Sequence, residues 1–178
     1  MLRFFPVVGN VRYSNDWGAP RSGGRSHEGN DLIAPMGAVI VAVDDGVITQ
    51  GTTSVGGNIV NLVSDDGDRF YYAHLLGFEG GNRRVKAGDI IGYVGMSGNA
   101  KGTVPHLHFE YHPENGAPVN PYPYLQRAQK AQINTLTAPQ AASGVGKLVA
   151  LTAIAVGSAY VLGNVVIPAF APKSRAST

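Results

Sequence analysis

Residues 104–112 read VPHLHFEYH, and this stretch carries the clearest fold signal in the chain. Apolar and polar residues alternate along HLHFE, as they do in a β-strand with one buried face, because successive side chains of a strand point to opposite sides. We therefore expect Leu107 and Phe109 to face a core. His106 and His108 then share the other face, with their Cβ atoms roughly 7 Å apart.

Similar strand-like runs recur around this stretch. They are AVIVAV (38–43), GVITQ (46–50), NIVNLV (58–63), RFYYAH (69–74) and DIIGYV (89–94). Asp-Asp-Gly triplets at 44–46 and 65–67 separate neighbouring runs and are expected to form hairpin turns. No strong amphipathic helical period precedes residue 125. The prediction is a mainly β, compact antiparallel domain, sandwich-like or barrel-like, over residues 1–125.

The composition narrows the chemistry. The chain has no cysteine, which excludes disulfides and thiolate metal ligands, so any metal is held by His, Asp or Glu. The formal net charge is +2, and no basic cluster with interleaved aromatic residues stands out. We therefore predict no nucleic-acid partner. Charged residues make up only 15% of the chain, which directs attention to a membrane segment.

The last third of the chain differs in composition from the first domain. Residues 126–146 are rich in Ala, Gln and Ser and are predicted to be a linker, in part helical before Pro139. Residues 148–167, LVALTAIAVGSAYVLGNVVI, carry no charge. A run of about 20 apolar residues can span a bilayer, so we predict a single transmembrane helix at 147–168, with a buried soluble helix as the alternative. Residues 169–178 form a short basic tail.

Two further segments hold residues suited to a metal or to proton transfer. In HEGND, His27 and Asp31 are four residues apart and are expected where a loop enters a strand. Imidazole nitrogen with carboxylate oxygen suits zinc. In RFYYAH, Tyr72 and His74 are expected on one face of a strand.

These motifs, His27-x-x-x-Asp31, Tyr-Ala-His74-Leu and His106-x-His108-Phe-Glu, occur in one order with strand-rich spacers. Over roughly residues 5–125 the sequence closely resembles the lysostaphin-type zinc metallopeptidases, which cleave peptide cross-links of bacterial peptidoglycan. The resemblance implies one zinc ion held by His27, Asp31 and His108, with water as the fourth ligand. It also implies that His74 and His106 are catalytic.

Within that scheme we assign His106 as the base and His74 as the group that stabilises the oxyanion, although both could orient the water. Tyr72 is predicted to line the substrate groove. Glu110 either orients a metal ligand or is a solvated charge, and His112 is predicted to lie on the surface.

The resemblance leaves the scissile bond open. The family cuts both glycyl-glycine bridges and D-alanyl links to a diamino acid, and residues 76–84 are predicted to set the choice.

The amino-terminal segment MLRFFPVVGNVRYSND does not look like a signal peptide, although the expected substrate lies outside the cytoplasmic membrane. We therefore predict a phage virion component that breaches the wall during infection or release. Its predicted partners are peptidoglycan, a lipid membrane through residues 148–167, and other virion proteins. The alternative is a membrane-anchored structural or virion component, or a host envelope protein, whose peptidase-like domain binds or remodels the wall.

Overall fold

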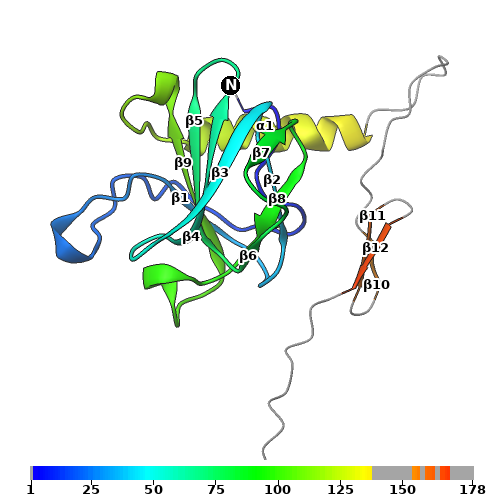
Figure 1. Ribbon diagram of the computed structural model, residues 1–178, viewed down its shortest axis with the longest axis horizontal. Coiled ribbons are helices and arrows are strands. Elements are labelled where there is room, and N and C mark those ends of the chain that lie inside the picture. The colour runs from blue at the N-terminus through cyan, green and yellow to red at the C-terminus, as the bar shows by residue number, and fades with distance from the viewer. Residues whose placement is uncertain (1, 138–153, 157–158, 163–164, 169–178) are drawn as a thin grey trace, which may run out of the picture. The chain divides into compact units, whose positions relative to one another are not determined.

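The computed structural model describes residues 2–137, 154–156, 159–162 and 165–168 (Figure 1). They belong to two units, Met1–Thr135 and Leu136–Thr178, which are described separately.

The first unit is built from two antiparallel sheets and one long helix (Figure 1). The large sheet has the strand order β1-β9-β5-β4-β3-β7, and the small sheet has the order β2-β8-β6. The large sheet consists of β1 (Asn30–Ile33), β9 (His106–His112), β5 (Arg69–Leu75), β4 (Gly57–Ser64), β3 (Gly46–Thr53) and β7 (Arg83–Val85). The small sheet consists of β2 (Val39–Val41), β8 (Ile90–Tyr93) and β6 (Gly77–Phe78). Short 3₁₀ turns lie at Ser22–Gly24, Gly98–Ala100 and Pro113–Asn115.

One face of the large sheet forms the core, and the alternation predicted for β9 is confirmed. Leu107 and Phe109 are fully buried, and Leu32 of β1 is buried on the same side. The small sheet contributes Ile40 and Ile91 to this core. Because successive residues alternate, Asp31 of β1 and the polar residues of β9 lie together on the opposite face of the sheet.

The two Asp-Asp-Gly triplets have different outcomes. The triplet at 65–67 joins β4 to β5, which pair antiparallel, so this hairpin is confirmed. The triplet at 44–46 joins β2 to β3, which lie in different sheets, so the hairpin expected there was wrong. The runs on both sides of this triplet are strands, but β2 pairs with β8 and β3 pairs with β4 and β7. A turn signal alone does not fix which strands pair.

Helix α1 (Tyr122–Thr137) extends beyond the predicted domain boundary at residue 125. It occupies the first part of the segment predicted as a linker, in agreement with the helical part expected before Pro139. Leu125 is fully buried and Ala128 is 3% exposed, so the helix packs on the core of the first unit. Tyr13 strengthens this contact by donating a hydrogen bond to Gln129 at 2.9 Å.

The described residues between 147 and 168 form strands, so the single hydrophobic helix predicted there is not observed in the part of this segment that the structure describes. β10 (Ile154–Val156), β11 (Ala159–Leu162) and β12 (Val165–Pro168) pair as an antiparallel sheet. The sequence offers a reason, because these strands are rich in Val and Ile, which favour strands. In the sequence they are separated by Gly-Ser at 157–158 and Gly-Asn at 163–164, pairs typical of two-residue hairpin loops.

Among the described residues, no helix is long and apolar enough to cross a membrane. The rest of the predicted linker, residues 138–146, and the tail at 169–178 lie outside the described residues.

Candidate metal centre and its pocket

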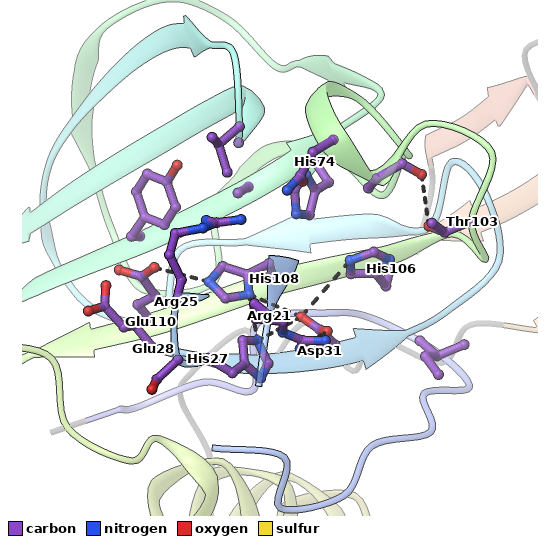
Figure 2. A pocket seen from close by; sticks show the side chains of 18 of the residues that line it. Arg21, Arg25, His27, Glu28, Asp31, His74, Thr103, His106, His108 and Glu110 are labelled. Atoms are coloured by element: carbon purple, nitrogen blue, oxygen red, sulfur yellow. Dashed lines mark hydrogen bonds and ion pairs between the residues drawn. The ribbon is translucent and has the colours of Figure 1, made fainter. Parts of the chain in front are cut away.

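An open pocket of about 520 Å³ lies on the polar face of the large sheet, where β1, β9 and β5 are neighbours. All five residues predicted for the metal or for catalysis line it, and Figure 2 shows their side chains converging. They are His27, Asp31, His74, His106 and His108.

Three donor atoms form a compact triangle at one end of the pocket. Nε2 of His27 lies 2.9 Å from Nδ1 of His108 and 3.1 Å from Oδ1 of Asp31. Nδ1 of His108 lies 3.0 Å from the same Asp31 oxygen. A tetrahedral zinc site with bonds of about 2.0–2.1 Å has ligand–ligand distances of about 3.4 Å. The triangle is therefore close to the size that a tetrahedral zinc ion needs, and the donors are the nitrogen and oxygen types that zinc binds.

His27 is aimed into this triangle by a backbone contact. Its ring is 3% exposed, and Nδ1 lies 2.9 Å from the carbonyl oxygen of Asp16. A carbonyl only accepts, so Nδ1 carries the hydrogen, and in the neutral ring Nε2 keeps a free electron pair. Burial opposes the charged form, but hydrogen bonds to Asp16 and Asp31 outweigh it and raise the pKa of His27 to about 9 in the metal-free chain.

His108 is held in the opposite tautomer by a side chain of its own strand. Its Nε2 lies 3.0 Å from Oε1 of Glu110, and this hydrogen bond leaves Nδ1 for the triangle. The other oxygen of Glu110 accepts from Nε2 of His112 at 2.7 Å. Burial lowers the pKa of His108, but hydrogen bonds to Asp31 and Glu110 raise it overall. Glu110 is thus an orienting residue for a predicted ligand. His112 is only 5% exposed, so the prediction that it lies on the surface was wrong.

The two carboxylate oxygens of Asp31 have different partners: one belongs to the triangle and the other contacts Arg21. Oδ1 faces the two histidines, whereas Oδ2 accepts a 2.6 Å hydrogen bond from Arg21. Burial raises the pKa of Asp31, but hydrogen bonds from the rings of His108 and His27 in their protonated forms outweigh it, so the pKa lies well below its usual range. This arrangement keeps the group ionised and presents one oxygen to a metal.

Gly29 allows the loop that carries His27 to lie against β9. A Cβ atom at Gly29 would lie 2.5 Å from the carbonyl oxygen of Phe109 and 2.8 Å from Cε1 of His108. Any larger residue would therefore push the His27 loop away from the second histidine ligand. The glycine in HEGND is needed for the closeness of the two predicted ligands.

The predicted catalytic histidines lie beside the triangle and present the same ring nitrogen. Nδ1 of His106 lies 2.8 Å from the carbonyl of Val104, and Nδ1 of His74 lies 2.9 Å from the carbonyl of Ser97. In their neutral forms both rings therefore carry their hydrogen on Nδ1 and keep Nε2 as an acceptor. Nε2 of His106 lies 3.9 Å from Oδ1 of Asp31. The ring centroids of His74 and His106 lie 5.0 Å apart.

A β-bulge in β5 brings His74 to the pocket. Val60 pairs with Tyr72 but Asn58 pairs with Leu75, so β5 has one extra residue at this point. His74 has a φ of 67°, an uncommon conformation for a residue other than glycine. Burial, followed by the neighbouring His106, lowers the pKa of His74 to about 4, so this ring is neutral at pH 7.

The same bulge explains why the prediction for Tyr72 was wrong. Tyr72 is fully buried, and its hydroxyl accepts a hydrogen bond from the backbone N–H of Val43 at 3.1 Å. Tyr71 and Ala73 line the pocket, and the extra residue then brings His74 to their side. Simple alternation from His74 therefore selected the wrong tyrosine.

Several residues of the site were not identified from the sequence. Arg21 and Arg25 line the pocket, and Asp16 supports His27. No motif within the sequence links Asp16 to His27, because the contact depends on how the loop folds back. Residues 76–84, predicted to govern specificity, do not line the pocket.

Two histidines and an aspartate that converge on an open sheet face form a candidate metal site of the kind found in metal-dependent hydrolases. Comparison with known protein families identifies one family: the sequence model of Peptidase family M23 matches residues 25–121, and the chain belongs to that family. The resemblance to lysostaphin-type enzymes is thereby confirmed.

Individual relatives agree with this assignment. A DD-carboxypeptidase/endopeptidase of Neisseria meningitidis is 41% identical over 114 residues, which cover 60% of this chain and 26% of that protein. This chain thus matches about a quarter of that relative's length. The catalytic domain of the antimicrobial peptidase lysostaphin from Staphylococcus simulans superposes with a TM-score of 0.58 and 32% identity, covering 66% of this chain and 93% of that one. A zinc-containing peptidase from Vibrio cholerae superposes with a TM-score of 0.55 and 26% identity, covering 66% of this chain and 38% of that one.

Proposed function

We propose that this chain is a zinc-dependent endopeptidase that hydrolyses peptide cross-links of bacterial peptidoglycan. The observation that carries the proposal is the triangle formed by Nε2 of His27, Oδ1 of Asp31 and Nδ1 of His108. Membership of Peptidase family M23 and the likeness to a zinc-containing peptidase support it.

In this proposal the triangle holds one zinc ion, and the pocket side of the triangle gives access to water and substrate. Zinc, when bound, lowers the pKa of water to about 7 and polarises a carbonyl. Each protein ligand is already held by a second contact: His27 by Asp16, His108 by Glu110 and Asp31 by Arg21. Such contacts fix the ligand tautomers before a metal arrives.

The chain's own proton-transfer groups are His106 and His74. Water adds to the scissile carbonyl, and a ring nitrogen takes the proton that the water loses. We assign this step to Nε2 of His106, which lies closer to the Asp31 corner of the triangle. The same nitrogen then returns the proton to the leaving amine, so that an amide and water become a carboxylic acid and an amine.

His74 has a different part in this scheme from the one that the sequence suggested. As a neutral ring with its hydrogen on Nδ1, it presents an acceptor to the pocket and not a donor. It therefore orients the attacking water by accepting a hydrogen bond. Only after taking up a proton would it donate to an oxyanion.

The test is hydrolysis of purified, chemically defined peptidoglycans by the zinc-loaded chain, with the released peptides identified by mass spectrometry. We expect new amino and carboxyl ends within the cross-links, loss of release with a chelator, and recovery when zinc is returned. Asp31→Ala should abolish release, and Arg84→Gln, which alters an exposed ion pair with Asp65, should not. A folded, zinc-loaded chain that releases nothing would overturn the proposal.

The setting of the reaction is a separate proposal that rests on the sequence alone. We propose a phage particle as the carrier, with the bacterial envelope as the alternative. Mass spectrometry of purified particles tests this directly, because the carrier proposal requires the chain to be present in them.

A further inference from the structure

Two arginines enter the pocket from one loop, and only one of them is paired with carboxylates. Arg21 donates to Asp31 at 2.6 Å, and its Nη2 also lies 3.5 Å from Oδ2 of Asp16. Arg21 is therefore already paired with Asp31 of the triangle and with Asp16, which supports His27. Arg25 lines the same pocket but forms no ion pair with a carboxylate in the part of the chain that the structure describes.

The Arg25 guanidinium is exposed and partly fixed. Its Nε donates to the carbonyl of Ser22 at 3.2 Å, so the terminal nitrogens remain open to a ligand. Figure 2 shows the side chain reaching into the pocket over the ring of His108.

The loop that carries Arg25 is joined to the metal centre by short contacts. Pro20 and Ser26 form an antiparallel bridge, and the N–H of Arg21 donates to the carbonyl of Arg25 at 2.8 Å. His27 follows directly, and its N–H donates to Ala19 at 2.9 Å. A cation held in this way loses little conformational freedom when it binds an anion.

We propose that Arg25 binds a free carboxylate on the residue next to the scissile amide, and so selects D-alanyl–diamino acid cross-links over glycyl-glycine bridges. This inference rests on the proposed function. A guanidinium matches the geometry of a carboxylate with parallel hydrogen bonds. A diamino acid linked through an amine next to its carboxylate places that charge beside the scissile bond. A glycine inside a bridge has no carboxylate there.

The other carboxylates near the triangle leave Arg25 available for this role. Both oxygens of Glu110 are taken by His108 and His112, and both oxygens of Asp31 are taken within the centre. Glu28 also lines the pocket and is exposed, and no ion pair joins it to Arg25 among the described residues. A substrate carboxylate would therefore meet a cation that no carboxylate of the described chain already pairs with.

The test uses two synthetic cross-linked peptides that are identical except that the carboxylate of the leaving-side residue is free in one and amidated in the other. We expect the zinc-loaded chain to favour the free carboxylate by about 10- to 100-fold in kcat/KM, the range of a charge-assisted hydrogen bond. Arg25→Gln should bring this ratio close to one by slowing only the carboxylate peptide. Arg25→Lys should keep part of it, because the charge remains but the fork is lost.

Arg84→Gln is the matched control, since it removes an arginine outside the pocket and should leave the ratio unchanged. Zinc content is measured on each variant. A variant that keeps its zinc has lost only the arginine contact, whereas one that loses zinc has an altered metal centre. If Arg25→Gln slows both peptides equally with zinc retained, the inference is overturned.

If the chain cleaves neither peptide, the proposed function fails, but the inference is still decided by binding. Calorimetric titration of both peptides into the zinc-loaded chain should then show the same preference and the same dependence on Arg25. Equal affinities for the two peptides would overturn the carboxylate role.

Discussion

At the scale of single residues, the metal centre depends on which nitrogen of each histidine carries hydrogen. His27 donates from Nδ1 to a carbonyl and His108 donates from Nε2 to Glu110, so opposite nitrogens are left to face one another. A ring free to present either nitrogen would have to be ordered as the metal binds. Here the chain orders it in advance, and Glu110 is the side chain on which this ordering can be tested.

Glu110→Gln is expected to weaken zinc binding by about tenfold or more, the effect usual for partners of metal ligands. The amide keeps the size of the side chain but removes its charge and one of two acceptors, so it cannot accept from both His108 and His112. Zinc affinity is measured by competition with a chelating dye. Glu114→Gln, on the exposed turn after the same strand, is the matched control and should bind zinc as the unaltered chain does. Equal affinities for both variants would refute the orienting role.

Zinc binding should also release protons near neutral pH. The pKa of His27 is raised from 6.5 to about 9 in the metal-free chain, so at pH 7 this ring is mostly protonated and must lose its proton to become a ligand. Zinc affinity should therefore increase with pH until His27 is deprotonated at about pH 9, and above that pH His27 should cause no further increase. Calorimetry in buffers of different ionisation enthalpy measures the protons released. A value of zero at pH 7 would contradict a protonated His27.

Much of this residue-scale geometry was predictable, and the exceptions have one physical cause. The faces of Leu107, Phe109 and the two histidines of β9 follow from strand alternation, which holds where the strand is regular. Tyr72 was misplaced because β5 is irregular next to His74. Arg25 has no sequence signal beyond its charge, since only the folded loop places it in the pocket.

At the scale of elements, the bulge in β5 and the segment around Gly98 act together. His74 donates through its ring to Ser97, and the N–H of Ser97 lies 3.3 Å from the carbonyl of His74. Ser97 in turn accepts from the N–H of Asn58 through its hydroxyl at 2.9 Å. This packing requires Gly57, where a Cβ atom would lie 2.3 Å from the backbone nitrogen of Gly98. The irregular pairing of β5 is therefore held by specific contacts. A sequence pattern with period two cannot predict it.

Gly57→Ala should therefore lower the free energy of unfolding by about 2–4 kcal/mol, because it combines an unfavourable φ with overpacking. Gly67→Ala is the matched control. Gly67 also has a positive φ, 89°, but a Cβ atom there meets nothing within 4 Å, so its cost should be only about 1–2 kcal/mol. Urea denaturation measures both. Similar losses for the two variants would show that the approach of Gly57 to Gly98 carries no extra energy.

At the scale of the whole molecule, the question is where the peptidase unit ends. The change in composition at residue 125 marked the end of the β-rich region, but a helix of polar composition can still bury one side. Leu125 and Ala128 are buried, and Tyr124 contacts Tyr111 with ring centroids 4.9 Å apart. The compact first unit accordingly runs to Thr135. The later uncharged run was predicted as a helix from hydropathy alone, which does not distinguish a span from strands rich in Val and Ile.

A chain ending at residue 137 should therefore keep the full stability and zinc affinity of the peptidase unit, whereas a chain ending at residue 125 should not. The shorter chain loses Ala128 and the Gln129 hydrogen bond to Tyr13, and it retains too little of α1 to hold Leu125 in place. We expect it to unfold with a free energy about 2–5 kcal/mol lower, the cost of removing a large buried side chain. Urea denaturation of both chains, monitored at the single Trp17, gives the comparison. Matching midpoints would place the boundary at 125 after all, and would reduce α1 to an appendage of a unit that is complete without it.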